Sequence, residues 1–280
     1  MNFTAWEARK HIETKYKTAL RKLGRLLIDL IGQNDSPDAI ATKLITFGES
    51  ESFGAWSNAL AHTFVTNTLE ENARTWRQAA RMSGQGRDLL SALQREFQGP
   101  VGARVQELIN ANAQYIKNVP SDVAQRLVQH VGKEAFEGSR TAFTTEEFRD
   151  YVGQITMWHA KLISRTESAK AMSSLTQARA EYLGRDWYIW RTSEDQRVRK
   201  SHQNMDGVLC RFSDPLSPES LIGEKPVGNY GPGGIFNCRC YAEPVIIWDE
   251  FEWPMRVCVN GSVAQMSKRS FEERFGGDTT

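Results

Sequence analysis

Apolar side chains recur at helical spacing through the first two-thirds of the chain. One run of Leu and Ile residues keeps this spacing until Gly32 ends it. A serine followed by proline at 36–37 is typical of a helix start, because proline is favoured in the first turn. Two further amphipathic stretches cover residues 88–97 and 101–116. The pattern therefore predicts a helical region over residues 1–117.

A break in the helical pattern is predicted at residues 118–121. Pro120 biases the residue before it away from helix, and Ser121 can accept the first free backbone amides of a new helix. An apolar stripe then follows at helical spacing, formed by Val123, Leu127 and Val131. We therefore expect a new helix to begin at 121.

The most periodic segment of the chain follows at residues 144–183. Its apolar positions stay on one face throughout, and two glutamates favour the positive end of the helix near its start. Gly184 lies where a left-handed C-terminal cap belongs. The segment predicts one long helix, or two helices joined near Ser164.

The pattern changes after Gly184. Residues 187–192 alternate aromatic and β-branched side chains, which predicts a strand. Residues 193–204 favour a short helix with a serine cap, residues 228–234 form a glycine-rich loop, and residues 241–247 predict a second strand. A compact module of mixed structure is therefore expected at the end of a helical protein.

Together these patterns predict an α+β fold, with a predominantly helical N-terminal two-thirds and a small C-terminal α+β module. The predicted division is 1–117 for the helical N-terminal region and 118–250 for a second domain. That domain combines helices at 121–183 with the α+β module at 185–250. Residues 251–280 form a polar tail that we expect to be partly disordered at its glycine-rich end.

Charge is nearly balanced overall but uneven along the chain. The formal net charge is +1, which argues against a protein that wraps nucleic acid with its whole surface. Residues 1–32 nevertheless hold seven Lys or Arg against three acids. A solvated helix face is the simpler interpretation, and contact with DNA is the alternative. The candidate contacts are Arg9, Lys10, Lys17 and Arg21.

No membrane span is expected. The sequence holds no run of about 18 apolar residues, and its first residues lack the apolar core of a signal peptide. We therefore expect a protein that is synthesised and kept in a cytoplasm.

The four cysteines all lie in the last third of the chain. In a reducing compartment they are thiols or metal ligands rather than disulfides. A closed tetrahedral zinc site is conceivable, with the ligands His202, Cys210, Cys238 and Cys240. The Cys-x-Cys spacing argues against it, because two such side chains on a strand would point to opposite faces. Simple packing of buried thiols is the alternative, so we expect no cofactor that the protein requires.

Several polar side chains cluster in the sequence after the first predicted strand. Asp195, Arg199 and His202 would share one face of the predicted short helix, and Asp206 could reach back to Arg199 or His202. One interpretation is an acid–base pair with arginine as an anion clamp, as in nucleases. We favour a structural polar network, because no activated nucleophile accompanies these residues.

Two other short motifs favour architecture over catalysis. Arg165 and Glu167 lie about 200° apart around a helix, so they cannot serve one small site together, and Thr166 between them can bond to a helix carbonyl. Asn237 suits a turn, and Arg239 is a natural partner for Asp195 or Asp206.

Four features occur in a fixed order in this sequence. They are Arg165-Thr166-Glu167, then Trp190-Arg191-Thr192, then the run of Asp195, Arg199, His202, Asp206 and Gly207, and finally Asn237-Cys238-Arg239-Cys240. This string resembles the phage Mu F-like minor head proteins, also known as phage head-morphogenesis proteins. The resemblance covers roughly residues 115–247, and we identify no family motif in residues 1–114.

The resemblance implies a structural protein of a tailed bacteriophage rather than an enzyme. Such proteins are present in few copies in the virion, at the portal vertex or in the head interior. Their expected partners are the portal protein and other head proteins, with packaged DNA as a further candidate, and they assist capsid assembly or DNA delivery. The alternative is a nuclease-like hydrolase that uses Asp195, His202 and Asp206.

Overall fold

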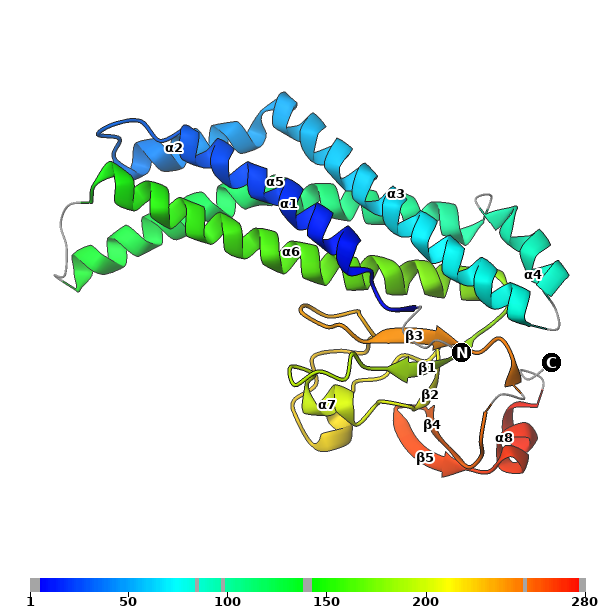
Figure 1. Cartoon of the computed structure of the whole chain (residues 1–280). Helices are drawn as coiled ribbons and strands as arrows, with labels where there is room; N and C mark the ends of the chain where they lie inside the picture. The colour runs from blue at the N-terminus through cyan, green and yellow to red at the C-terminus, as the bar shows by residue number, and fades with distance from the viewer. Residues whose placement is uncertain (1–5, 84–85, 97–98, 138–142, 249–250, 277–280) are drawn as a thin grey trace. The chain divides into compact units, whose positions relative to one another are not determined.

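The chain forms two compact units. A computed structural model describes residues 6–83, 86–96, 99–137, 143–248 and 251–276 (Figure 1). The first compact unit, which we call the helical unit, is formed by Lys10–Thr66 and Glu107–Glu167. The second compact unit, which we call the mixed unit, is formed by Met1–Arg9, Asn67–Gln106 and Ser168–Thr280. The predicted α+β class is confirmed, because long helices dominate the earlier part of the chain and the strands all lie after residue 186.

The helical unit is built from long helices that continue along the chain into the mixed unit. Its elements are α1 (Lys10–Asp29), α2 (Pro37–Glu49) and parts of α3 (Glu51–Met82), α5 (Pro100–Phe136) and α6 (Thr145–Tyr182). The ring of Tyr16 stacks on Phe64 at a centroid distance of 4.1 Å, which joins α1 to α3. The serine cap of α2 is confirmed, since Ser36 accepts a hydrogen bond from the backbone of Ala39. None of the helices in the described ranges is long and apolar enough to span a membrane.

The predicted helix break at 118–121 is wrong. Pro120 lies inside α5, which continues to Phe136. An interior proline costs a helix about 3 kcal/mol, because it lacks the backbone N–H and its ring crowds the preceding turn. Val119, Val123 and Leu127 are all buried on this stretch of α5. Since each such side chain contributes about 1.5–3 kcal/mol on burial, packing outweighs the proline. The predicted domain boundary at 118 therefore falls within a helix, and the domain division stays a prediction.

The long helix predicted over 144–183 is confirmed as the single helix α6. It ends where the sequence predicts, because Gly184 adopts a left-handed conformation with φ of +67°. The amide of Arg185 then donates to the carbonyl of Ala180 at 2.7 Å, which closes the helix end. This cap turns the chain directly into the first strand.

The mixed unit contains a five-stranded sheet. Its strands are β1 (Trp187–Arg191), β2 (Leu209–Arg211), β3 (Tyr241–Pro244), β4 (Met255–Val259) and β5 (Ser262–Met266), in the order β3-β1-β2-β4-β5. Only β2 and β4 pair in parallel. The shorter elements of the unit are α4 (Gly86–Leu93), α7 (Lys200–Gln203), the 3₁₀ helix η3 (Ser220–Ile222) and α8 (Lys268–Phe275).

Strand β1 is buried on both of its faces. Tyr188 and Trp190 belong to a core shared with α3, α4 and the loops that carry the cysteines. Trp187 and Ile189 point to the opposite face, where they pack with Phe271 of α8. The alternation follows from the two-residue period of a strand. The sheet therefore fixes the position of the loops at the ends of β1 and β3.

The interpretation of residues 251–280 as a separate polar tail is wrong for most of its length. Strands β4 and β5 form a hairpin that extends the sheet, and α8 covers one of its faces (Figure 1). The hairpin turns at Asn260 and Gly261, which both have positive φ, as a two-residue turn of this kind requires. The disorder expected at the very end lies outside the described residues.

Candidate polar and thiol site

The loop after β1 does not form the short helix predicted for 193–204. Residues 195–198 form turns, and only Lys200–Gln203 are helical, as α7. Glu194 has a φ of +52°, and the carboxylate of Asp195 accepts a hydrogen bond from the amide of Arg197 at 2.9 Å. Such local bonds from aspartate compete with the helical pattern. Asp195, Arg199 and His202 therefore do not share a helix face, contrary to prediction.

Arg239 connects the cysteine loop to the loop after β1. Its guanidinium forms a two-pronged ion pair with the carboxylate of Asp195. Arg199 donates a hydrogen bond of 3.2 Å to the carbonyl of Phe236 and lies over the ring of the same residue. Asn237 takes a left-handed conformation, with φ of +58°. Of the two partners expected for Arg239, the structure selects Asp195.

Asp206 binds backbone rather than the other candidate site residues. One of its carboxylate oxygens accepts hydrogen bonds from the amide and the hydroxyl of Thr192, at 2.7 and 3.1 Å. Gly207 follows with φ of +76°, and its amide donates to the carbonyl of Trp190. The expectation that Asp206 reaches Arg199 or His202 is therefore wrong. Asp206 thus holds the end of β1 to the turn after α7.

His202 lies at the centre of a buried group of polar side chains. Only 2% of its surface is exposed. Its Nε2 lies 2.9 Å from the hydroxyl of Tyr230, which donates in turn to the carboxylate of Glu219. Because Tyr230 has one proton and gives it to Glu219, it must accept from Nε2–H of His202. The lone pair of a neutral His202 ring is therefore on Nδ1.

The hydrogen bond between Tyr230 and Glu219 shifts the pKa values of both residues. Burial raises the pKa of Glu219, but the bond from Tyr230 and smaller contributions outweigh it and lower that pKa below its usual range. Burial and the same carboxylate raise the pKa of Tyr230. Glu219 is therefore an ionised acceptor and Tyr230 a neutral donor. Sequence analysis missed both residues, which lie 17 and 28 positions after His202.

Cys238 and Cys240 face the Nδ1 atom of His202. Their sulfurs lie 3.5 and 3.4 Å from it. The two cysteines do not point to opposite faces as predicted, because residues 238–240 are a loop and not a strand. The hydrogen bond from Cys240, together with the His202 ring, lowers the pKa of Cys238 to about 4 despite burial. The same bond and burial raise the pKa of Cys240.

Cys210 is not part of this group, so the predicted four-ligand zinc set is wrong in that member. It lies on β2 and is buried next to Cys258 of β4, with which it shares a hydrogen bond. Among the described residues, the ligand atoms of His202, Cys238 and Cys240 lie within 4.8 Å of one another. These three residues also line a pocket of about 100 Å³, together with Arg197, Arg199 and Arg239 among others. The arrangement can hold a soft divalent cation.

The Arg165-Thr166-Glu167 motif singled out in the sequence lies in the helical unit. Glu167 is buried and accepts a hydrogen bond of 3.3 Å from the side chain of Asn112. Asn112 in turn accepts one from the hydroxyl of Tyr16, at 3.1 Å. Burial, and to a smaller extent Glu167, raise the pKa of Tyr16. Glu167 therefore joins α6 to α1 and α5, while Arg165 and Thr166 are half-buried.

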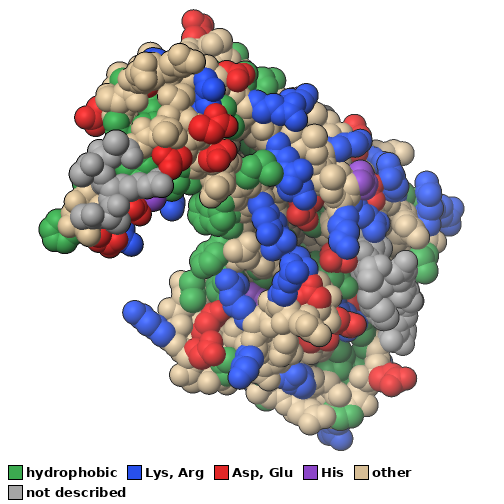
Figure 2. Space-filling view, turned by 60° about the vertical axis from the view of Figure 1, so that its left-hand side comes forward, with side chains coloured by type: hydrophobic (Ala, Val, Ile, Leu, Met, Phe, Trp, Pro, Cys, Tyr) green, Lys and Arg blue, Asp and Glu red, His purple; other side chains and the backbone are tan. Residues whose placement is uncertain are grey.

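The four basic candidates for DNA contact fall into two groups. Lys10 and Arg21 are exposed on α1 and Lys17 is half-buried, on the side away from the apolar stripe of that helix. Arg9 instead pairs with Glu71 at 2.8 Å in the mixed unit. Basic side chains are numerous on the face drawn in Figure 2, with acidic ones scattered among them. Three of the candidates thus remain available to an anionic partner.

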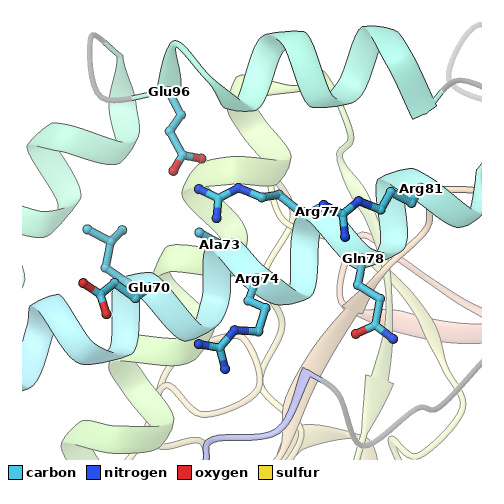
Figure 3. Close-up of a pocket in the computed structure, with 8 residues that line it drawn as sticks. Glu70, Ala73, Arg74, Arg77, Gln78, Arg81 and Glu96 are labelled. Carbon is cyan, nitrogen blue, oxygen red and sulfur yellow. The ribbon is translucent and has the colours of Figure 1, made fainter.

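A second basic surface, which sequence analysis missed, lies on α3. Arg74, Arg77 and Arg81 are exposed at spacings of three and four residues and line a groove of about 600 Å³ (Figure 3). Glu70 and Glu96 also line it. The signal is present in the sequence as arginines at helical spacing. Such a row suits anionic groups.

Comparison with known proteins identifies the segment that holds the site. The family model described as Phage Mu protein F like protein matches residues 121–243, less than half of the chain. An uncharacterized protein of Haemophilus influenzae is 33% identical over 143 residues, which are 51% of this chain and 30% of that relative. The chain thus spans under a third of the length of this relative. No solved structure matches. The match to the Phage Mu protein F like family model runs from the middle of α5 to β3 and contains every residue of the polar and thiol site.

Proposed function

We propose that the chain is a minor head protein of a tailed bacteriophage, which binds the portal vertex or the inner head and assists capsid assembly or DNA delivery. The observation that carries the proposal is the family match over residues 121–243. The matched segment includes the polar and thiol site and the Arg165-Thr166-Glu167 motif. These residues act by holding the fold, and the protein works by binding and positioning.

The geometry of the site supports a structural role over the nuclease alternative. A hydrolase that used Asp195, His202 and Asp206 would need these side chains to converge on one substrate. Asp195 instead pairs with Arg239, and Asp206 binds the Thr192 backbone. Neither carboxylate joins the group of ligand atoms around His202. A plasmid-cleavage assay with added Mg²⁺ is expected to show no activity; cleavage that His202→Ala abolishes without unfolding would favour the enzyme.

Co-expression with the portal protein of the same phage or prophage tests the proposed partner. We expect the two proteins to elute together from a size-exclusion column, with fewer copies of this chain than of the portal. The tail-tube protein of the same phage serves as a control partner and should elute separately. Separate elution from the portal and from the other head proteins would contradict the proposal.

The exposed basic residues of α1 are the surface that we propose for contact with packaged DNA. Counterion release makes such contacts sensitive to salt. A variant with Lys10, Lys17 and Arg21 changed to glutamate should bind duplex DNA more weakly and with a shallower salt dependence. A matched variant with Lys268, Arg269 and Arg274 of α8 changed in the same way is the control. Equal binding by both variants and the unmodified chain would remove α1 from the DNA surface.

A further inference from the structure

We propose that His202, Cys238 and Cys240 bind a zinc ion, or a similar thiophilic divalent cation, whose fourth ligand is a water molecule from the adjoining pocket. The inference goes beyond the proposed function and does not depend on it. Its ligands would be one imidazole nitrogen and two sulfurs. All three residues are at least 97% buried, with exposed fractions of 2%, 3% and 3%.

The two distances from the His202 nitrogen to the cysteine sulfurs are those of a tetrahedral zinc site. With Zn–S bonds of about 2.3 Å and Zn–N bonds of about 2.0–2.1 Å, tetrahedral angles separate sulfur from nitrogen by about 3.5–3.6 Å. The Nδ1 atom of His202 lies 3.5 Å from the sulfur of Cys238 and 3.4 Å from that of Cys240. An ion can therefore bind with only small side-chain movements.

The His202 ring is oriented as a ligand by the groups behind it. Its Nε2–H donates to the hydroxyl of Tyr230, and Tyr230 donates to Glu219. This chain of bonds leaves the lone pair on Nδ1, the atom that faces both sulfurs. Histidines that bind metal commonly donate their other ring N–H to an acceptor of this kind, which fixes the tautomer.

The second cysteine pair shows what plain packing of thiols looks like in the same unit. Cys210 and Cys258 lie on neighbouring strands, and no His, Asp or Glu of the described residues completes a ligand group with them. Cys238 and Cys240 instead follow the left-handed turn at Asn237 and bring both sulfurs to one nitrogen. Substitutions of Cys238 and Cys240 therefore test zinc binding, and a substitution in the pair of Cys210 and Cys258 is the matched control.

The open fourth position follows from the ligand count and the pocket. Structural zinc sites usually have four protein ligands, and three are present among the described residues. The pocket of about 100 Å³ that these three line is large enough for water. Arg197, Arg199 and Arg239 also line it, which disfavours a second cation and favours water or an anion beside the metal. The bound ion would tie the cysteine loop to α7.

Metal analysis of the purified full chain tests the proposal. We expect about one zinc ion per chain after equilibration with zinc and removal of excess. Cys238→Ser and Cys240→Ser should lose it, whereas the control Cys258→Ser should keep it. Tyr230→Phe removes the acceptor of the His202 N–H and should weaken zinc binding by about 10–100-fold. Retention of zinc by both Cys238→Ser and Cys240→Ser would overturn the proposal.

X-ray absorption at the zinc edge of the unmodified chain keeps the test independent of whether the variants fold. The expected shell is two sulfurs, one imidazole nitrogen and one oxygen. A shell without sulfur, or one with four sulfurs, would contradict the assignment. So would a Cys238–Cys240 disulfide in the freshly purified chain, or failure of the folded, reduced chain to take up zinc.

Discussion

Arg179 and Glu96 form an ion pair that is buried completely in the mixed unit. The guanidinium of Arg179 contacts both carboxylate oxygens of Glu96, each at 2.7 Å. The exposed fractions of the two side chains are 0% and 2%. Arg179 also donates to the side chain of Asn72, which donates in turn to Thr176 at 2.7 Å. The pair joins the C-terminal part of α6 to the segment after α4. Strand β1, which leads to the site, follows α6 directly.

Removing one partner of this pair should destabilise the protein strongly. Arg179→Met leaves the Glu96 carboxylate buried without its cation, and we expect the free energy of unfolding to fall by about 3–5 kcal/mol. The double change Arg179→Met with Glu96→Leu removes both charges and should recover most of that loss. Chemical denaturation of the three proteins measures both effects. A single variant as stable as the unmodified chain would mean that the pair is not buried as described.

The C-terminal hairpin and α8 should be integral to the mixed unit. Phe271 of α8 has no exposed surface, and its ring centre lies 4.9 Å from that of Trp187 and 5.1 Å from that of Trp253. Phe271→Ala should lower the free energy of unfolding by about 3–5 kcal/mol. The control is Phe136→Ala, because Phe136 is 94% exposed and its loss should change stability by less than about 0.5 kcal/mol. Equal melting temperatures for the two variants would show that α8 does not cover the sheet.

Local signals in the sequence predicted the elements that local forces determine. The serine cap of α2, the single long helix α6, the cap at Gly184 and the strand β1 are all confirmed. The helix break at Pro120 was wrong because tertiary burial of α5 outweighs a local preference. The short helix at 193–204 was wrong because the Asp195 side chain bonds to the nearby backbone instead.

Part of what was missed could have been read from the sequence. Asn260-Gly261 between two alternating segments is a strong signal for a hairpin, and it does mark the turn between β4 and β5. The contacts of His202 with Tyr230 and Glu219 could not be read in this way. They depend on how loops of irregular backbone cross, and no periodic pattern encodes that. The pair of Arg179 and Glu96 could not be read either, because the two residues are 83 positions apart and belong to different elements of the fold.

Asp186 should give the mixed unit a stability that depends on pH. Burial raises the pKa of Asp186, but hydrogen bonds from Ser213 and the ion pair with Arg211 at 2.7 Å outweigh this and lower it. A carboxylate with a lowered pKa in the folded state stabilises above its unfolded pKa, and the effect is lost as the pH falls through the folded pKa. Asp186→Asn should therefore cost about 1–2 kcal/mol at neutral pH. The difference from the unmodified chain should persist down to about pH 5 and shrink below the ordinary pKa of 3.8. Thermal unfolding across this range checks it; a gap that widens in acid would contradict the sign.

The ion pair between Asp195 and Arg239 should contribute little to stability, in contrast to that of Arg179. The exposed fractions of the two side chains are 37% and 27%, so solvent screens the pair. Asp195→Asn should lower the free energy of unfolding by at most about 1 kcal/mol. If the same variant loses several kcal/mol, the loop after β1 is held far more tightly than this exposure implies. Denaturant titration of Asp195→Asn and Arg179→Met under the same conditions compares the two losses of unfolding free energy directly.

Peptide mass spectrometry tests most directly whether this chain is a phage head protein. The samples are gradient-purified phage particles and portal-containing assembly intermediates from the source of this chain. We expect peptides of this chain in both, at few copies per portal ring. Absence of the chain from every particle and intermediate, with the protein recovered only in the free fraction of the lysate, would contradict a role in the head and return the Asp195, His202 and Asp206 hydrolase to consideration.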